Sequence, residues 1–323
     1  MKASNATKID KFASDVLAGL TSEPKSLSSR YFYDDEGSRL FMEIMKLPEY
    51  YLTRSELEIF TEQTADIYKA FSDGAELFDL IELGAGDGTK TAVLIQYFLE
   101  QAARFKYSAI DISLEACEEL SAKFRSEFPE LDLETLHGDY FQILGSLSAA
   151  KDRHKILLFL GSNIGNFKRE DAVSFFKSLR RVMNTSDKLF IGFDLQKDPR
   201  DIVRAYDDAT GVTAAFNLNL LTRINRELGG HFDIAKFSHY AVYRPIECAA
   251  RSFLISRETQ SVRIDAFDRS FDFDAWEAIF MEISQKYDMK MIAELAEESG
   301  FAIERTFYDT KRFYCDSLWK PLA

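Results

Sequence analysis

Between about residues 55 and 195, short apolar runs alternate with longer stretches in which apolar residues recur at helical spacing. This alternation is typical of a parallel sheet whose strands are joined by covering helices. The pattern predicts strands at 78–83, 107–112, 131–136, 155–160 and 189–195. It predicts helices at 55–72, 89–103, 114–128 and 169–184. We therefore expect an α/β fold with a mostly parallel sheet.

The pattern breaks after residue 195 and resumes only roughly 90 residues later, far beyond a connection inside a compact α/β unit. The intervening sequence predicts a small α+β module with a helical part and then antiparallel strands, at 200–228, 236–243, 246–256 and 260–264. A last helix and two final strands follow, at 288–299, 302–308 and 312–318. We expect the final strands to complete the sheet as an antiparallel pair.

Composition and charge restrict the class of protein. With 323 residues and 46% hydrophobic composition, the chain can bury a sizeable core. The sequence has neither an apolar stretch of membrane-spanning length nor an N-terminal secretory signal, so we expect a cytoplasmic protein. The formal charge of −13 argues against nucleic acid and membrane surfaces and favours a small-molecule partner. The cysteines and histidines show no metal-ligand spacing, so no metal site is expected.

A glycine-rich loop, Gly84-Ala-Gly-Asp-Gly88, stands between the first predicted strand and the next helix. Glycines at this place let the chain turn sharply and let a ligand approach the backbone closely. The third glycine comes one residue earlier than in the dinucleotide pattern, which disfavours a nicotinamide cofactor. A tight turn without any ligand is the alternative interpretation.

Acidic residues follow the next two predicted strands. Asp111 ends the second strand, where a carboxylate can accept both hydroxyls of a ribose; a helix-capping aspartate is the alternative. Asp139 follows the third strand and could accept an adenine amino group, with Tyr140 or Phe141 beside the ring. Together with the glycine loop, these positions outline a ligand site at the carboxyl edge of the sheet.

Longer motifs point to a family. They are Tyr31-Phe-Tyr-Asp-Asp-Glu-Gly-Ser38, Leu47-Pro-Glu-Tyr-Tyr51, Glu82-Leu-Gly-Ala-Gly-Asp-Gly88, Leu160-Gly-Ser-Asn-Ile-Gly-Asn-Phe167 and Ala205-Tyr-Asp-Asp-Ala-Thr-Gly-Val-Thr-Ala-Ala-Phe-Asn217. From about Tyr31 to Leu318 the chain resembles the histidine-specific methyltransferases that make hercynine, the first intermediate of ergothioneine biosynthesis.

The resemblance implies a Rossmann-like class I methyltransferase that uses S-adenosylmethionine (SAM). It implies a SAM-binding core at 59–196 and 286–323, and a substrate-binding domain at 1–58 and 197–285. The cofactor positions that it assigns are Gly84, Gly86, Lys90, Asp111, Asp139 and Tyr140.

The same resemblance assigns residues to the substrate. Asn166 and Tyr206 correspond to the pair that holds the amino-acid carboxylate, and Glu282 and Ser284 to the pair that recognises the imidazole. The family's aromatic positions near the amino acid fall on Tyr33 and Tyr50, with Tyr51 hard to distinguish from Tyr50. The alternatives are core aromatics for the tyrosines, a turn residue for Asn166 and a solvated helix-end charge for Glu282.

The resemblance implies methylation of the α-amino group of L-histidine, to give the trimethylated product hercynine, by an enzyme that we expect to be monomeric. The chain has Cys248 where the family commonly has methionine. The alternative function is therefore a same-fold N-methyltransferase for another amino acid or a tryptophan derivative. A non-catalytic cofactor-binding protein and a nicotinamide oxidoreductase are the remaining alternatives.

Overall fold

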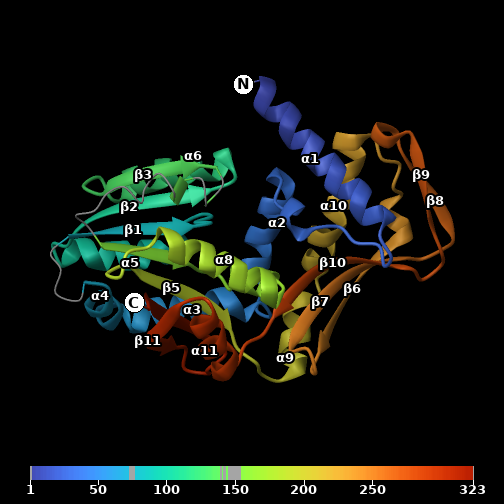
Figure 1. Cartoon of the computed structure of the whole chain (residues 1–323). Helices are drawn as coiled ribbons and strands as arrows, with labels where there is room; N and C mark the ends of the chain where they lie inside the picture. The colour runs from blue at the N-terminus through green and yellow to red at the C-terminus, as the bar shows by residue number, and fades with distance from the viewer. Residues whose placement is uncertain (1, 73–76, 139, 141–142, 145–153, 323) are drawn as a thin grey trace. The chain divides into compact units, whose positions relative to one another are not determined.

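The computed structural model describes residues 2–72, 77–138, 140, 143–144 and 154–322. It has two compact units (Figure 1). The sheet unit comprises Leu52–Gln196 and Gln285–Ala323, and the insertion unit comprises Met1–Tyr51 and Lys197–Ser284. Within the described ranges, no helix combines the length and the apolar character needed to cross a membrane.

The sheet unit is built on seven strands in the order β11-β12-β5-β4-β1-β2-β3. Their bounds are β1 Leu77–Leu83, β2 Arg104–Asp111, β3 Asp132–His137, β4 His154–Phe159, β5 Lys188–Asp194, β11 Phe301–Tyr308 and β12 Tyr314–Pro321. Strands β1 to β5 pair in parallel, whereas β12 pairs antiparallel with both β5 and β11. The expected α/β fold, with its mostly parallel sheet and final antiparallel pair, is confirmed.

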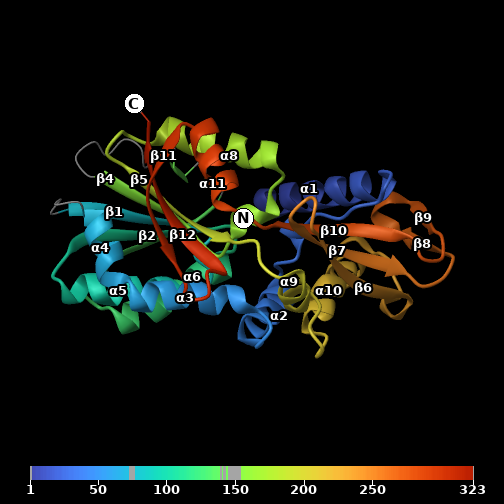
Figure 2. The same cartoon turned by 90° about the horizontal axis from the view of Figure 1, so that it is seen from below.

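Helices cover both faces of this sheet (Figure 2). One face carries α3 Tyr51–Glu62, α4 Thr64–Ser72, α5 Thr89–Glu100 and α6 Leu114–Glu127; the other carries α8 Arg169–Val182 and α11 Met289–Glu298. The single helix predicted at 55–72 is wrong, because α3 and α4 are separate helices. At the break, the Thr64 hydroxyl donates to the backbone carbonyl of Phe60, a local bond that competes with a regular helix.

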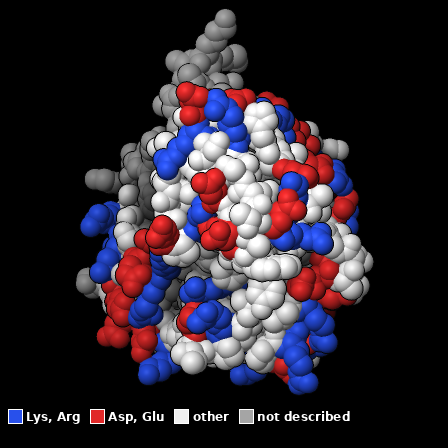
Figure 3. Space-filling model, turned by 90° about the vertical axis from the view of Figure 1, so that its right-hand side faces the viewer, with Lys and Arg blue, Asp and Glu red and all other residues white. Residues whose placement is uncertain are grey.

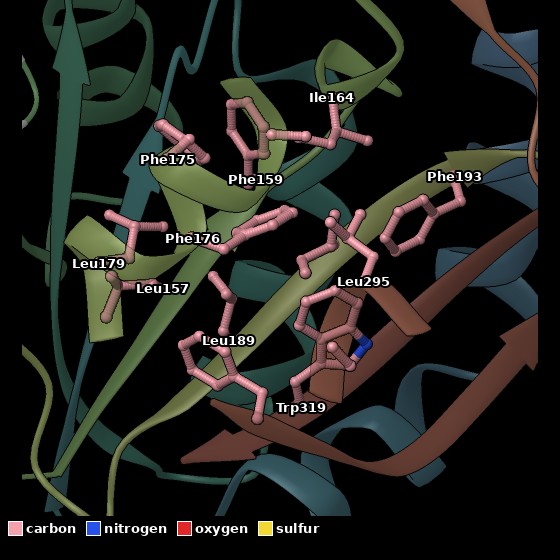
Figure 4. Packing of buried hydrophobic residues seen from close by; sticks show 14 of the residues in the cluster. Leu157, Phe159, Ile164, Phe175, Phe176, Leu179, Leu189, Phe193, Leu295 and Trp319 are labelled. Atoms are coloured by element: carbon pink, nitrogen blue, oxygen red, sulfur yellow. The ribbon is translucent and has the colours of Figure 1, made fainter. Parts of the chain in front are cut away.

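The main core of the sheet unit lies under α8 and α11 (Figure 4). Trp319 of β12 is fully buried, and its ring centroid lies 5.1 Å from that of Phe176 and 5.8 Å from that of Phe193. On the opposite face, Phe60 and Phe71 pack against Phe190 of β5. Strand β5 thus contributes large side chains to both faces, as expected of a central strand covered on both sides.

The insertion unit combines helices with two small antiparallel sheets. Its helices are α1 Lys2–Thr21, η1 Ser29–Tyr31, α2 Asp35–Lys46, α9 Pro199–Tyr206, α10 Val212–Leu228, η3 Ile234–Lys236 and η4 Asp265–Phe267. Its strands are β6 Phe237–Arg244, β7 Ala249–Ser256, β8 Gln260–Ile264, β9 Arg269–Phe273 and β10 Ala278–Gln285. They form one sheet in the order β10-β7-β6 and a hairpin of β8 and β9.

Two of these strands were not predicted. Strand β9 lies within the acidic sequence Asp-Arg-Ser-Phe-Asp-Phe-Asp, and β10 leads into α11. Since Glu282 lies inside β10, its interpretation as a helix-end charge is wrong.

The face shown in Figure 3 intermixes basic and acidic side chains. Such a face produces an alternating potential rather than the continuous positive field that attracts polyanions.

Candidate active site

The glycine loop joins the end of β1 to the start of α5. Gly84, Gly86 and Gly88 have φ angles of 76°, 54° and 65°, in the left-handed region that glycine adopts without strain. A Cβ atom on Gly88 would lie 2.6 Å from the Phe124 ring, so the loop packs tightly against α6 there. A Cβ atom on Gly86 would meet nothing within 4 Å. The loop therefore offers open backbone surface at Gly86.

Asp111 lies beside this loop at the end of β2. One carboxylate oxygen accepts a hydrogen bond from the backbone N–H of Gly86 at 3.5 Å, and the other accepts one from Ser113 at 2.9 Å. The cap of α6 is Ser113, whose hydroxyl accepts from the backbone N–H of Ala116 at 3.2 Å. The capping side chain is thus Ser113 and not Asp111.

Two more of the assigned cofactor residues lie near the loop. Tyr140 lies close to Gly84: a Cβ atom placed on Gly84 would be 3.0 Å from the Tyr140 hydroxyl. The Lys90 ammonium would be 3.4 Å from a Cβ on Gly161, in the turn that follows β4. Asp139 lies outside the described residues, as does Phe141. Among the residues that are described, the loop, Asp111, Tyr140 and Lys90 line the carboxyl edge of the parallel strands.

A buried carboxyl group, that of Glu82, links the elements that flank the glycine loop. Glu82 of β1 accepts hydrogen bonds from the Tyr107 hydroxyl at 2.5 Å and the Thr91 hydroxyl at 2.9 Å, which ties β1 to β2 and α5. Burial raises the pKa of Glu82 to about 7, against the opposing effect of these two hydrogen bonds. The carboxyl group holds the two elements on either side of the loop.

This arrangement fits SAM. A carboxylate at a strand end can accept ribose hydroxyls, an ammonium can meet the carboxylate of an amino-acid moiety, and the open glycine surface admits close approach. Asp111, Lys90 and Gly86 supply these three features within the sheet unit.

In the insertion unit, the structure brings Tyr206 and Ser284 together. Their hydroxyl oxygens lie 2.7 Å apart, and both side chains are buried. Glu282 lies two residues before Ser284 on β10, so the two side chains project from the same face of the strand. The His239 ring nitrogen Nε2 is 2.9 Å from the Tyr206 carbonyl oxygen. Burial lowers the pKa of His239, so the neutral ring donates to that carbonyl.

The two assigned tyrosines share one aromatic cluster. Phe41 lies 5.5 Å from Tyr33 and 6.1 Å from Tyr50 between ring centroids, and Phe216 lies 5.6 Å from Tyr33. Tyr51 has different surroundings, because its hydroxyl accepts from the Lys197 ammonium at 2.9 Å. The surroundings of the two tyrosines therefore differ, since Tyr50 belongs to the cluster that contains Tyr33.

Asn166 belongs to the sheet unit, whereas the other five assigned substrate residues belong to the insertion unit. It is the last residue of η2, Asn163–Asn166, which follows β4. The Tyr287 hydroxyl donates to the carbonyl of Ile164 at 3.3 Å and so supports this turn. Asn166 itself is exposed at the end of the turn.

Sequence reasoning missed Glu56 of α3, which bonds both Lys90 and the Gly161 amide. A signal was present in the sequence. Leu52, Ile59 and Phe60 recur at helical spacing, and Glu56 falls on the same face because it lies four residues from both Leu52 and Phe60. A carboxylate on an apolar helix face predicts a buried partner.

Comparisons with known proteins agree over most of the chain. Residues 12–321 match the family model described as histidine-specific methyltransferase, SAM-dependent. The chain is 39% identical over 284 residues to the histidine N-alpha-methyltransferase of Mycolicibacterium smegmatis, covering 88% of this chain and 87% of that relative. It is 36% identical over 283 residues to the histidine N-alpha-methyltransferase of Mycobacterium tuberculosis, covering 87% and 86%.

A third relative is Ergothioneine biosynthesis protein 1 of Neurospora crassa. The chain is 34% identical to it over 208 residues, which is 64% of this chain and 23% of that protein. The similarity to this longer protein therefore concerns one part of it.

Proposed function

This chain belongs to the family of histidine-specific, SAM-dependent methyltransferases, and we propose that it methylates the α-amino nitrogen of L-histidine to give hercynine. The observation that carries the proposal is the buried pair Tyr206 and Ser284, with Glu282 on the same face of β10. These polar groups match the hydrogen-bonding needs of histidine. The runner-up is methylation of another amino acid or a tryptophan derivative.

The proposed substrate contacts use groups of complementary chemistry. Asn166 and Tyr206 donate hydrogen bonds to the substrate carboxylate. Glu282 accepts the imidazole N–H, and the Ser284 hydroxyl bonds the other ring nitrogen. A guest that cannot donate to Glu282 still removes water from this half-buried carboxylate but does not replace the lost hydrogen bond, which penalises the wrong substrate.

Catalysis in this proposal comes mainly from alignment. When bound, SAM would supply a methyl group on a sulfonium; the amine lone pair would form the N–C bond in line as the C–S bond breaks, with S-adenosylhomocysteine as the leaving group. The protein holds the substrate at its carboxylate and its imidazole, so the nitrogen between them can reorient between successive methylations. Desolvation favours the neutral amine that must attack. Tyr33 and Tyr50 accommodate the positive charge of the methylated product through cation–π contact.

Substrate competition tests the assignment of Glu282. Mass spectrometry of histidine incubated with the protein and SAM should show the trimethylated product. In Glu282→Ala, kcat/KM for histidine should fall by about tenfold or more relative to that for tryptophan and tyrosine. Asp272→Ala, which removes an exposed carboxylate from the same unit, serves as the matched control and should leave the ratio unchanged. An unaltered ratio in Glu282→Ala would refute the role of Glu282.

Cys248 motivates the runner-up substrate. It lies in the turn before β7 with a φ of 51°, and its thiol donates to the Pro245 carbonyl at 3.3 Å. Calorimetric titration of amino acids in the presence of S-adenosylhomocysteine (SAH) separates the candidates. Tightest binding of histidine supports the proposal, and tightest binding of tryptophan or a derivative supports the runner-up.

A further inference from the structure

Glu56 of α3 is a fully buried carboxylate in the sheet unit, beside the Gly161 turn that follows β4. One of its oxygens accepts from the Tyr314 hydroxyl at 2.7 Å and from the Gly161 amide at 2.8 Å. The other oxygen accepts from the Lys90 ammonium and lies 3.1 Å from the same Gly161 amide. Donors therefore surround Glu56 within the protein, so its role is exerted through its neighbours and not by contact with a ligand.

The charge on Lys90 compensates the charge on Glu56. Burial disfavours the ammonium, but the negative charge of Glu56 outweighs it and raises the pKa of Lys90. A buried carboxylate without such a partner would be strongly unfavourable. An ammonium has three donors, so Lys90 can bond Glu56 and still donate to a second anion.

Asp316 of β12 is a fully buried carboxyl group beside this pair. Burial and the neighbouring Glu56 charge raise the pKa of Asp316 well above its ordinary value. The neutral form of Asp316 is therefore favoured, and in that form it adds no second negative charge beside Glu56.

The backbone leaves room for this arrangement. A Cβ atom on Gly192 of β5 would lie 2.1 Å from the Tyr314 hydroxyl and 2.5 Å from Glu56, so only glycine fits there. The side-chain amide of Asn163 would lie 3.8 Å from a Cβ on Gly161 and 3.9 Å from one on Gly84. The Gly161 turn and the glycine loop are thus close neighbours.

We propose that Glu56 is a positioning residue for the cofactor: it fixes the Lys90 ammonium and the Gly161 turn before the carboxylate of the cofactor's amino-acid moiety arrives. The inference rests on the proposed assignment of Lys90 to that carboxylate. Preorganisation avoids ordering a long flexible side chain on binding, so affinity for the cofactor increases.

Calorimetry with SAH tests this on the full chain. Glu56→Gln keeps the shape but loses the charge, so the Kd for SAH should rise about tenfold, and KM for SAM should rise more than kcat falls. Glu56→Asp retains the charge and should recover part of the affinity. In Glu56→Gln/Lys90→Gln, binding should be no weaker than in Lys90→Gln alone, because the amide oxygen at position 56 still accepts from Gly161 and only the link to Lys90 is lost.

Asp187→Asn is the matched control. Asp187 is a buried partner of Lys155, 3.6 Å from its ammonium. The pair lies at the amino ends of β4 and β5, away from the glycine loop at the carboxyl ends. This variant should lose stability but keep the wild-type Kd for SAH. An unchanged Kd in Glu56→Gln, or additive losses in the double variant, would overturn the inference. If Glu56→Gln does not fold, Glu56→Asp decides in the same way: weakened binding supports the inference and wild-type binding overturns it.

The outcome is separable from that of the proposed function. SAH binding that weakens in Glu56→Gln supports the positioning role even if histidine is not methylated. Methylation of histidine with equal SAH binding in wild type and Glu56→Gln would support the proposed function and reject the positioning role.

Discussion

At the scale of single residues, Glu82 makes the stability of the folded protein depend on pH. Its pKa rises from 4.5 to about 7, chiefly because the carboxyl group is buried. Between these values the folded protein binds this proton more tightly than the unfolded chain does. Stability from this group is therefore complete below about pH 4.5 and is lost as pH rises through about 7.

Glu82→Gln should accordingly flatten the pH dependence of stability. As pH rises from about 4.5 to above 7, the free energy of unfolding of the wild type should fall by on the order of 1–3 kcal/mol relative to that of the variant. Urea unfolding of both proteins at several pH values measures the difference. Because other titrating groups are common to the two proteins, they cancel in the comparison. Parallel pH profiles would show that Glu82 keeps its ordinary pKa.

Tyr206 and Ser284 should act as a coupled pair. Tyr206→Phe or Ser284→Ala removes one of two buried hydroxyls that lie 2.7 Å apart, and with it the hydrogen bond between them. Each change should raise KM for histidine about tenfold. In the double variant, the fold increase in KM should be smaller than the product of the two single increases. Steady-state kinetics with saturating SAM measures this. Independent, multiplicative effects would mean that the two hydroxyls do not function together.

Residue-level prediction worked where chemistry follows a fixed spacing. Gly86 and Asp111 could be placed together because glycine turns and acidic strand ends have characteristic positions in α/β sheets. The contact between Tyr206 and Ser284 joins residues 78 positions apart, and only the resemblance to a family suggested that they belong to one site. The anchoring of Glu82 by Tyr107 depends on strand register, which the sequence does not specify.

At the scale of elements, a buried ion pair joins the end of β5 to the segment before α11. The Lys286 ammonium lies 2.7 Å from the Asp194 carboxylate, and both side chains are fully buried. The neighbouring backbone is also paired, since the Tyr287 N–H donates to the Asp194 carbonyl at 2.9 Å. These contacts fix the start of α11 against the central sheet.

Lys286→Met should therefore destabilise the protein by about 3–5 kcal/mol, because it removes the positive charge that lies 2.7 Å from the buried Asp194 carboxylate. Adding Asp194→Asn should recover most of the loss. Urea unfolding of the two single variants and the double variant measures both effects. If Lys286→Met and the double variant were equally stable, the loss in Lys286→Met would not come from the uncompensated charge of Asp194.

Apolar runs located the strands of the central sheet because strands covered on both faces must be apolar. In the insertion unit, the sequence pattern located β6, β7 and β8 but missed β9 and β10. In β10, Ile279 and Met281 are buried while their neighbours are only partly so, a pattern too short to separate a strand from a helix end. Strand β9 contains one acidic residue, Asp272, and an aspartate flanks it at each end, so its sequence does not indicate a strand; pairing with β8 supplies its hydrogen bonds.

At the scale of the whole molecule, each unit contains one of the two tryptophans. Trp319 of the sheet unit is fully buried, whereas Trp276 of the insertion unit is 72% exposed. Unfolding transfers Trp319 from the core to water but changes the surroundings of Trp276 much less. Tryptophan fluorescence therefore reports mainly on the sheet unit, in which the assigned cofactor residues lie.

SAH should raise the melting temperature followed by Trp319 fluorescence, because a ligand that binds only the folded state stabilises that state. At a hundredfold excess over Kd the gain is about 2.7 kcal/mol. Trp276→Phe should show the same shift as wild type, since Trp319 carries the signal. Asp111→Ala should show a smaller one, because it removes the carboxylate beside Gly86. A full shift in Asp111→Ala would place SAH away from the glycine loop, and the cofactor assignment would then fail together with the geometry built on it.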